Sequence, residues 1–148
     1  MFSEKELSII NQALSIIESK ARTSDAITSP SIAANLCTTK LAHLEHEVFA
    51  VAFLDNQHRL ISFDVLSIGT IDSASVYPRE IVKAALKHNS AAVMLSHNHP
   101  SGAVEPSAAD KRITTKLVEA LSLVDVRVLD HIIVGTQGHY SFAEHGLI

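Results

Sequence analysis

Apolar residues recur at helical spacing near the start of the chain. Leu7, Ile10, Leu14 and Ile17 lie three or four positions apart, which is the spacing of one face of an α-helix. A serine and a glutamate three residues apart precede them, as in a capping box. The pattern predicts an amphipathic helix over residues 3 to about 20, whose apolar stripe needs a surface to pack on.

A stretch of small polar residues follows this helix. It reads ARTSDAITSPS and predicts a linker at residues 21 to 30. Ser29 and Pro30 fit the cap and the first turn of a second helix, which we expect to run through IAANLCTTKLAHL. The chain therefore divides into an N-terminal helix with its linker, residues 1–28, and a domain formed by residues 29–148.

Short apolar runs then alternate with helical patterns. VFAVAFL and AAVMLSH are almost continuously apolar, which predicts strands that are covered on both faces. DNQH is typical of a hairpin turn. Further strands are expected in RLISFDVLSIGT, SASVY, RVLDHIIVG and YSF, and further helices in PREIVKAALKHN and SAADKRITTKLVEALSLV. This order predicts a three-layer α/β (α+β) fold, a mixed β-sheet flanked by helices.

Composition narrows the classes of protein that fit. The net charge of −4 is spread without a basic cluster, which disfavours a duplex-binding surface but leaves a small nucleic-acid site open. Cys37 is the one cysteine, so a disulfide framework and a cysteine-based zinc cluster are both excluded. The polar start and the lack of an apolar run of about 20 residues predict a cytoplasmic protein without a membrane segment. Its oligomeric state stays open.

The segment HNHPSGAVEPSAAD, residues 97 to 110, carries the strongest chemical signal. His97 and His99 are two apart at the end of a predicted strand, so both side chains face the same side and can converge on one ion. Asp110 lies in the first turn of the next helix, where its carboxylate is a candidate third ligand. Two imidazoles and one carboxylate suit zinc and leave a fourth position for water, whose pKa the metal lowers to about 7.

Each half of this segment also has a simpler interpretation. Ser107 and Asp110 fit a helix cap and a first-turn acid. With nine histidines in the chain, a His-x-His pair can arise by chance. The two halves together, on one strand, loop and helix, are more specific than either alone and favour a metal site.

The same segment resembles the metal-binding signature of the JAMM (JAB1/MPN) family, and its HNHPSG core is similar to the RadC branch. GTIDSASVYPREIVKAAL, LVDVRVLDHIIVG and SFAEHGL also resemble RadC-type sequence, so the resemblance covers about residues 30 to 148. It implies a JAB1/MPN-like (cytidine-deaminase-like) core, here preceded by an extra N-terminal helix. It also implies Zn²⁺ held by His97, His99 and Asp110.

The resemblance further places the family's serine at Ser107 and its upstream glutamate at Glu47. Glu47 directly precedes VFAVAFL, so a strand there would put its carboxylate at the mouth of a buried sheet. Desolvation can raise the pKa of such a carboxyl toward that of a general base. Glu45 shares the parity of Glu47 and is the alternative, further from the apolar run.

Other histidines give weaker signals. His43 and His46 are three apart in a polar connection, where we expect solvated side chains. His131 lies in an apolar strand, either as a core histidine or as a neighbour of the metal ligands. Tyr77 stands where RadC-type sequences often have a histidine. Longer RadC proteins also carry a helix-hairpin-helix region that we do not find in this sequence, so their link to DNA repair transfers poorly.

These features favour a zinc-dependent metallohydrolase of the metallopeptidase or isopeptidase type. Glu47 would take a proton from the activated water, Ser107 would stabilise the oxyanion, and the partner would be a peptide or isopeptide substrate. A non-catalytic binding module and a DNA-repair-associated factor are the alternatives. A zinc nucleobase deaminase is excluded, because its signature needs two cysteines in P-C-x-x-C.

Overall fold

Strands and helices alternate along the chain from residue 30 onward. The computed structural model describes residues 1–23, 27, 29–69 and 76–148. In chain order its elements are α1 (Glu4–Thr23), α2 (Pro30–Leu41), β1 (Val48–Leu54), β2 (Leu60–Ile68), α3 (Pro78–Lys87), β3 (Ala92–Asn98), α4 (Ala108–Ser122), β4 (Arg127–Gly135) and β5 (Gly138–Ser141).

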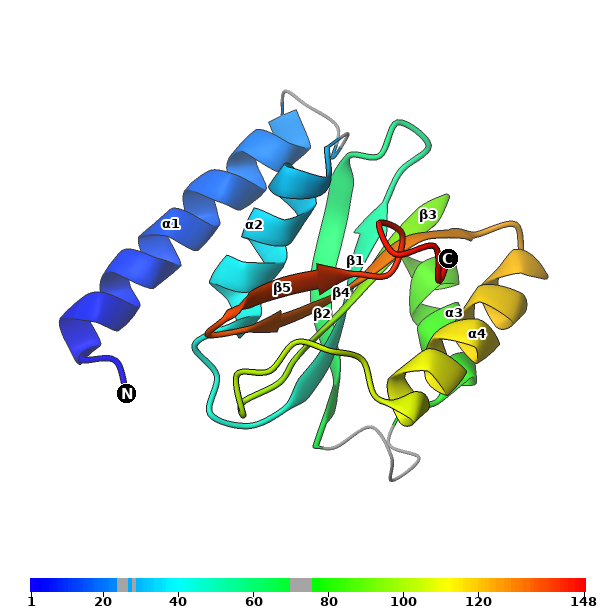
Figure 1. Cartoon of the computed structure of the whole chain (residues 1–148). Helices are drawn as coiled ribbons and strands as arrows, with labels where there is room; N and C mark the ends of the chain where they lie inside the picture. Colours follow the sequence, from blue (N-terminus) through cyan, green and yellow to red (C-terminus); the bar gives the residue numbers. More distant parts are fainter. Residues whose placement is uncertain (24–26, 28, 70–75) are drawn as a thin grey trace.

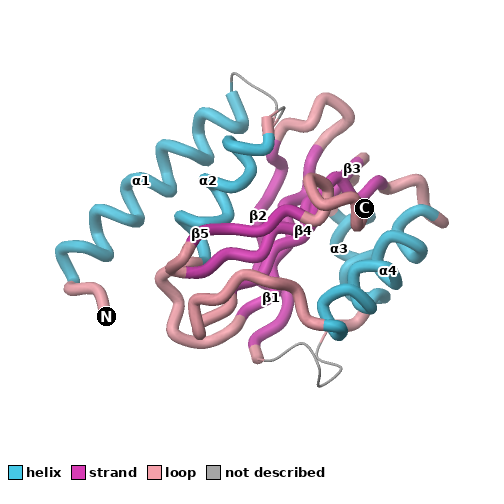
Figure 2. Tube along the Cα trace, in the orientation of Figure 1, coloured by secondary structure: helices cyan, strands magenta, loops and turns pink. Residues whose placement is uncertain are grey.

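The strands form one mixed sheet in the order β2-β1-β3-β4-β5 (Figure 2). β3 and β4 are parallel, and the other neighbouring pairs are antiparallel. Two parallel neighbours need a crossover connection, which α4 supplies here. The start of α4 therefore lies near the C-terminal end of β3.

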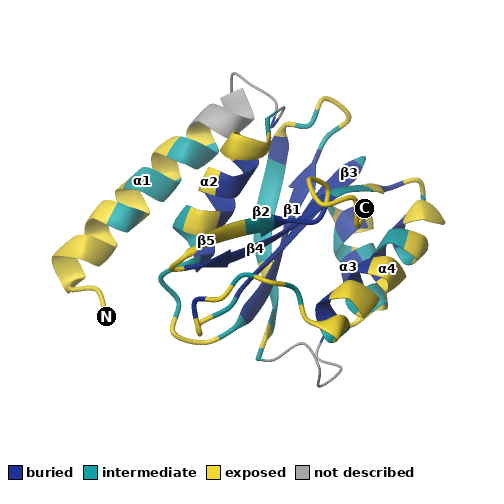
Figure 3. Cartoon of the chain, in the orientation of Figure 1, coloured by how far each residue is buried: buried dark blue, intermediate teal, exposed yellow. Residues whose placement is uncertain are grey.

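Helices cover both faces of this sheet, α2 on one side and α3 with α4 on the other (Figure 1). Along β1 the even-numbered residues pack with α2, and the odd-numbered residues pack with α3 and α4. Every residue of β1 and β3 is buried, and the central strands are the darkest part of Figure 3. The predicted three-layer architecture is confirmed.

Several predicted boundaries were wrong by a few residues. The second helix ends at Leu41, short of the predicted Leu44. Val76 and Tyr77 are not in a strand, because Pro78 starts α3 and Tyr77 is the extended residue before it. The other residues of SASVY, and residues 24–26 and 28 of the predicted linker, lie outside the described part. The last strand ends at Ser141, and the next residue begins a turn.

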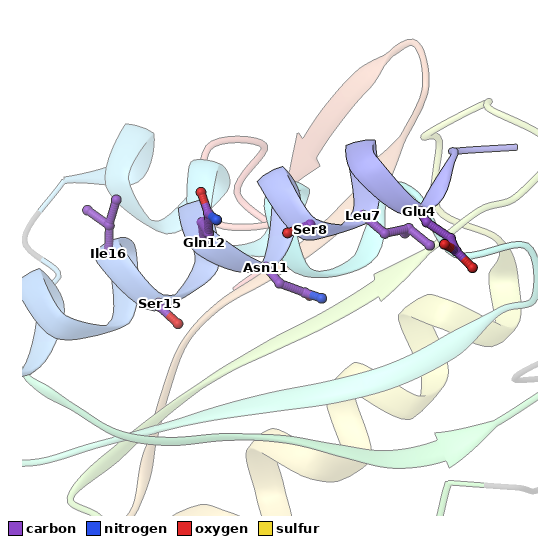
Figure 4. Close-up of a pocket in the computed structure, with 7 residues that line it drawn as sticks. All are labelled: Glu4, Leu7, Ser8, Asn11, Gln12, Ser15 and Ile16. Atoms are coloured by element: carbon purple, nitrogen blue, oxygen red, sulfur yellow. The ribbon is translucent and has the colours of Figure 1, made fainter.

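Helix α1 lies outside α2 (Figure 1) and has no fully buried residue in its described part. Ile10, Leu14 and Ile17 of the predicted stripe are half-buried, whereas Leu7 is exposed. The outer face of α1 bears a shallow recess (Figure 4) lined by Glu4, Leu7, Ser8, Asn11, Gln12, Ser15 and Ile16. In the described part of the chain, no helix is both long enough and apolar enough to cross a membrane.

Candidate metal centre

Strand register brings Glu47 to the two histidines of HNH. β1 runs antiparallel to β3 with Phe49 opposite His97, so continuing that register by two residues places Glu47 opposite His99. The backbone N–H of His99 donates to Val134 O at 2.9 Å, which keeps His99 aligned with β4. His97 and His99 have the same parity, so both lie on the face that α4 covers.

A tightly packed loop, residues 99–106, carries the chain from β3 to α4. Gly102 has φ of +94°, a conformation that favours glycine. A Cβ at Gly135 would lie 2.6 Å from Gly102 O, so the loop backbone rests directly on the end of β4. The absence of a side chain at position 135 therefore fixes the path by which the chain reaches α4.

A capping box aims Asp110 at the histidines. The Asp110 N–H donates to Ser107 Oγ at 3.0 Å, and the Ser107 N–H donates to Asp110 Oδ2 at 2.8 Å. This reciprocal pair satisfies the first turn of α4 and fixes the Asp110 rotamer. Asp110 is buried, while Ser107 is exposed at the helix end.

The side chains of the resulting cluster are close enough together to share one metal ion. His97 Nε2 and His99 Nε2 are 2.9 Å apart, and the two oxygens of Asp110 lie 3.3 Å from these nitrogens, one oxygen to each. Ligand atoms bonded about 2.0–2.1 Å from a tetrahedral zinc are about 3.3 Å from one another. The two Asp110 distances have this value, each to a different oxygen, and the two nitrogens are somewhat closer, so the donor types are compatible with zinc.

Glu47 lies slightly further out. Its Oε1 is 3.9 Å from His99 Nε2, and one ligand atom each from Glu47, His97 and His99 fall within 4.8 Å of one another. Glu47 could therefore also reach an ion in this cluster. Asp110 is closer to both imidazoles than Glu47 is, so both carboxylates are candidates for the third ligand.

The charge states of these groups also suit a cation. Burial alone would raise the pKa of Asp110, but the adjacent imidazoles of His97 and His99 and the backbone N–H of Ser107 hold it well below its ordinary value, so it is an anionic donor. Burial lowers the pKa of His97 and keeps that ring neutral near pH 7. The hydrogen bond with Asp110 raises the pKa of His99 in spite of its burial. Protons therefore compete with a metal mainly at His99.

His131 is a direct neighbour of the ligands. Its Nε2 lies 2.7 Å from His97 Nδ1, and its Nδ1 lies 2.6 Å from Thr114 Oγ1. Phe142 stacks on the His131 ring with centroids 4.6 Å apart, and Phe49 packs edge-on against it at 5.6 Å. Burial lowers the pKa of His131 well below its ordinary value. The sequence left His131 as either a core histidine or a neighbour of the metal ligands. The structure shows that it is buried and that it contacts the candidate ligand His97.

Asn98 supports the site from the opposite face of β3, a role the sequence did not reveal. Its Oδ1 accepts from the N–H of Val48 at 2.8 Å, and its Nδ2 donates to His46 O at 3.0 Å. These two bonds hold the backbone on either side of Glu47. The only signal in the sequence was the alternation in HNH, which turns Asn98 away from the two histidines.

The other residues considered from the sequence have no described contact with this cluster. Glu45 is exposed in a bend before β1. The ring of His43 contacts the ring of Phe2, with centroids 6.0 Å apart, and His46 is exposed. Tyr77 is 54% exposed and makes no side-chain cap to α3.

A mixed sheet between helix layers, with histidines and carboxylates converging where β3 ends, defines a class of α/β protein with a candidate metal centre. A family model described as the RadC-like JAB domain matches residues 27–147, and the chain belongs to this family. The resemblance seen in the sequence is confirmed.

Relatives carry the same family assignment. A UPF0758 protein of Vibrio cholerae serotype O1 is 53% identical over 138 residues, which cover 93% of this chain and 87% of the relative. UPF0758 proteins of Pseudoalteromonas translucida and Chromohalobacter salexigens are 60% and 56% identical, and the matches cover 84% and 82% of this chain. In those two, the chain spans about half the length of the relative, 56% and 54%. These names state a family and no activity.

Proposed function

We propose that this protein is a zinc-dependent metallohydrolase that cleaves a peptide or isopeptide bond. The observation that carries the proposal is the convergence of His97, His99 and Asp110, with the Asp110 oxygens 3.3 Å from the two imidazoles and Glu47 3.9 Å from His99. The RadC-like JAB family membership supports a hydrolase of this type.

Each residue has a distinct role in the proposed reaction. His97, His99 and Asp110 would hold zinc, which supplies a Lewis acid that polarises the scissile carbonyl and acidifies water. Glu47 is at the rim of the site, with its side chain 16% exposed. There it can take a proton from the attacking water and deliver it to the leaving amine.

Ser107 supplies a hydroxyl next to the Asp110 ligand. In the cap its Oγ accepts a hydrogen bond from Asp110 N–H, and a serine hydroxyl that accepts still has its own proton to donate. We assign this donor to the oxygen of the carbonyl under attack, where negative charge develops.

Zinc content measured together with hydrolysis tests the proposal. We expect the purified protein to bind about one zinc and to cleave members of a peptide and isopeptide library. The His97→Ala/His99→Ala double variant should lose both the metal and the activity. Stoichiometric zinc in that variant would contradict the ligand assignment. Stoichiometric zinc without cleavage in the wild-type protein would favour the non-catalytic binding module. Cleavage of nucleic acid would favour the DNA-repair-associated factor.

A further inference from the structure

A line of hydrogen bonds runs behind the candidate ligand His97, from the backbone of α4 to the imidazole. Thr114 Oγ1 is 2.7 Å from the carbonyl oxygen of Asp110 and 2.6 Å from His131 Nδ1. His131 Nε2 is in turn 2.7 Å from His97 Nδ1. Thr114, His131 and His97 are all buried, so water does not supply alternative partners.

The contact between Thr114 and the Asp110 carbonyl determines which atom donates the proton in the other two hydrogen bonds. A carbonyl oxygen only accepts, so the 2.7 Å contact with Asp110 O requires the single hydroxyl proton of Thr114. Thr114 Oγ1 can then only accept from His131, and the proton of that bond belongs to His131 Nδ1. The reverse arrangement would leave the Thr114 and Asp110 oxygens facing each other at 2.7 Å without a proton between them.

The neutral form of His131 transmits this direction to His97. Full burial between the rings of Phe49 and Phe142 favours the uncharged imidazole. A neutral ring with a proton on Nδ1 has none on Nε2, so the 2.7 Å contact with His97 needs the proton of His97 Nδ1. His97 Nε2 is then left with an unshared electron pair, and this is the atom that faces Asp110 and His99.

We infer that Thr114 and His131 are positioning residues that hold His97 in the tautomer whose Nε2 is free to bind a metal. His99 reaches the same tautomer by a separate route, because its Nδ1 lies 2.8 Å from Ala103 O and must donate to it. With both rings neutral, two unprotonated nitrogens face each other at 2.9 Å, an arrangement that either a proton on His99 or a metal cation relieves. The consequence for metal binding rests on the proposed zinc site, whereas the tautomers themselves do not.

Nuclear magnetic resonance of the metal-free protein tests the tautomers directly. Long-range ¹H–¹⁵N correlation spectra of the histidine rings distinguish Nδ1–H from Nε2–H. The measurement uses the full chain after zinc removal, at about pH 8, above the ordinary imidazole pKa of about 6.5. We expect Nδ1–H for both His97 and His131. An Nε2–H tautomer at His97 would overturn the inference.

Variants of Thr114 add a metal-binding readout. Thr114→Val keeps the shape and removes the hydroxyl, so His131 loses its acceptor and its single tautomer. Zinc affinity, measured by competition with a chelator, should weaken about 10- to 100-fold, as for other partners of metal-ligating histidines. Thr114→Ser restores the hydroxyl and should restore both the tautomer and the affinity.

Thr115 offers a matched control on the same helix. Its Oγ1 donates to Lys111 O at 3.1 Å, the same bond to the carbonyl four residues earlier, but its side chain is exposed. Thr115→Val should therefore bind zinc like the wild-type protein. A folded Thr114→Val variant with wild-type affinity, or an equal loss in Thr115→Val, would overturn the inference. If Thr114→Val does not fold, the wild-type and Thr114→Ser spectra still decide.

The outcome separates this inference from the proposed function. A wild-type protein that binds no zinc would contradict the proposed function, while the histidine tautomers would remain measurable in the same sample. A protein that binds zinc with the expected tautomers but hydrolyses nothing would contradict the hydrolase and uphold the role of Thr114 and His131.

Discussion

Three consecutive residues at the end of β3 organise both halves of the site. His97 and His99 face the α4 side, and Asn98 faces the other side, where it bonds to the backbone around Glu47. The strand alternation therefore lets one tripeptide present two candidate ligands and also hold the segment that carries the candidate base.

Local spacing was enough to single out His97, His99 and Asp110, because they belong to one strand, loop and helix. The roles of His131 and Asn98 could not be predicted in this way. Their partners lie 34 and 50 residues away in the chain, and only the pairing of strands brings these segments together. A polar residue in an apolar strand indicates that a partner exists but does not identify it.

Glu47→Gln separates the base from the ligands. The amide cannot accept a proton from water, so activity on a confirmed substrate should fall by about 10²- to 10⁴-fold. Zinc content and melting temperature should stay close to wild type, because the three proposed ligands remain. Metal analysis and steady-state kinetics on the same preparation measure both effects.

Glu45→Gln is the matched control for this experiment, since Glu45 is exposed in the bend before β1. We expect it to be fully active. An inactive Glu45→Gln beside an active Glu47→Gln would show that the choice of Glu47 is wrong, and two active variants would contradict the proposed mechanism.

Zinc affinity should weaken as the pH falls, because protons compete for the imidazole nitrogens. The hydrogen bond with Asp110 raises the pKa of His99 above the ordinary 6.5 in the metal-free protein. The metal must therefore displace a proton from His99 at pH 6.5 and somewhat above it. As the pH is lowered, the zinc affinity consequently begins to fall above about pH 6.5. Chelator competition between about pH 5.5 and 8.5 measures this. A constant affinity across the range would count against His99 as a ligand.

At the scale of elements, the start of α4 combines a structural and a chemical role. The capping box between Ser107 and Asp110 both begins the helix and orients the carboxylate. The cap was predictable from the sequence because its residues are three apart. The prediction of a strand at Val76 and Tyr77 was wrong. SASVY has the alternation of a strand, but these two residues pair with no described strand.

Substitutions of Ser107 separate the two roles. Ser107→Ala should lose about 1 kcal/mol of unfolding free energy with the cap, and also about 10²- to 10³-fold in activity if the hydroxyl stabilises the oxyanion. Ser107→Asn keeps a capping oxygen but moves the donor, so we expect a melting temperature close to wild type and poor turnover. A fully active Ser107→Asn would show that Ser107 is a cap and nothing more.

At the scale of the whole molecule, α1 packs against α2 and also contacts β2 of the sheet. Its half-buried stripe was predictable from periodicity, but how deeply it packs was not, because that depends on the surface that α2 and β2 present to it. Ile17 contacts the core beneath α2, whereas its neighbour Ile16 is 61% exposed.

Two neighbouring isoleucines therefore measure how firmly α1 is held. Ile17→Ala should lower the unfolding free energy by about 1–2 kcal/mol. This loss is smaller than for the same substitution at a fully buried isoleucine, because Ile17 is only partly covered. Ile16→Ala should change it by less than about 0.5 kcal/mol. Denaturant unfolding of both variants provides the comparison, and equal effects would mean that α1 does not pack on the core as described.

The contact between Gly135 and Gly102 determines which positions of the loop are open to sequence variation. A methyl group at position 135 would meet the loop backbone at 2.6 Å, so it would displace residues 99–106 and, through them, the start of α4. Gly135→Ala would thus shift the candidate ligand Asp110 indirectly, because the added methyl group contacts the loop and none of the candidate ligands. Exposed Ala103 and Glu105 lie on the same loop. Libraries that probe the proposed activity should diversify those two positions and keep both glycines.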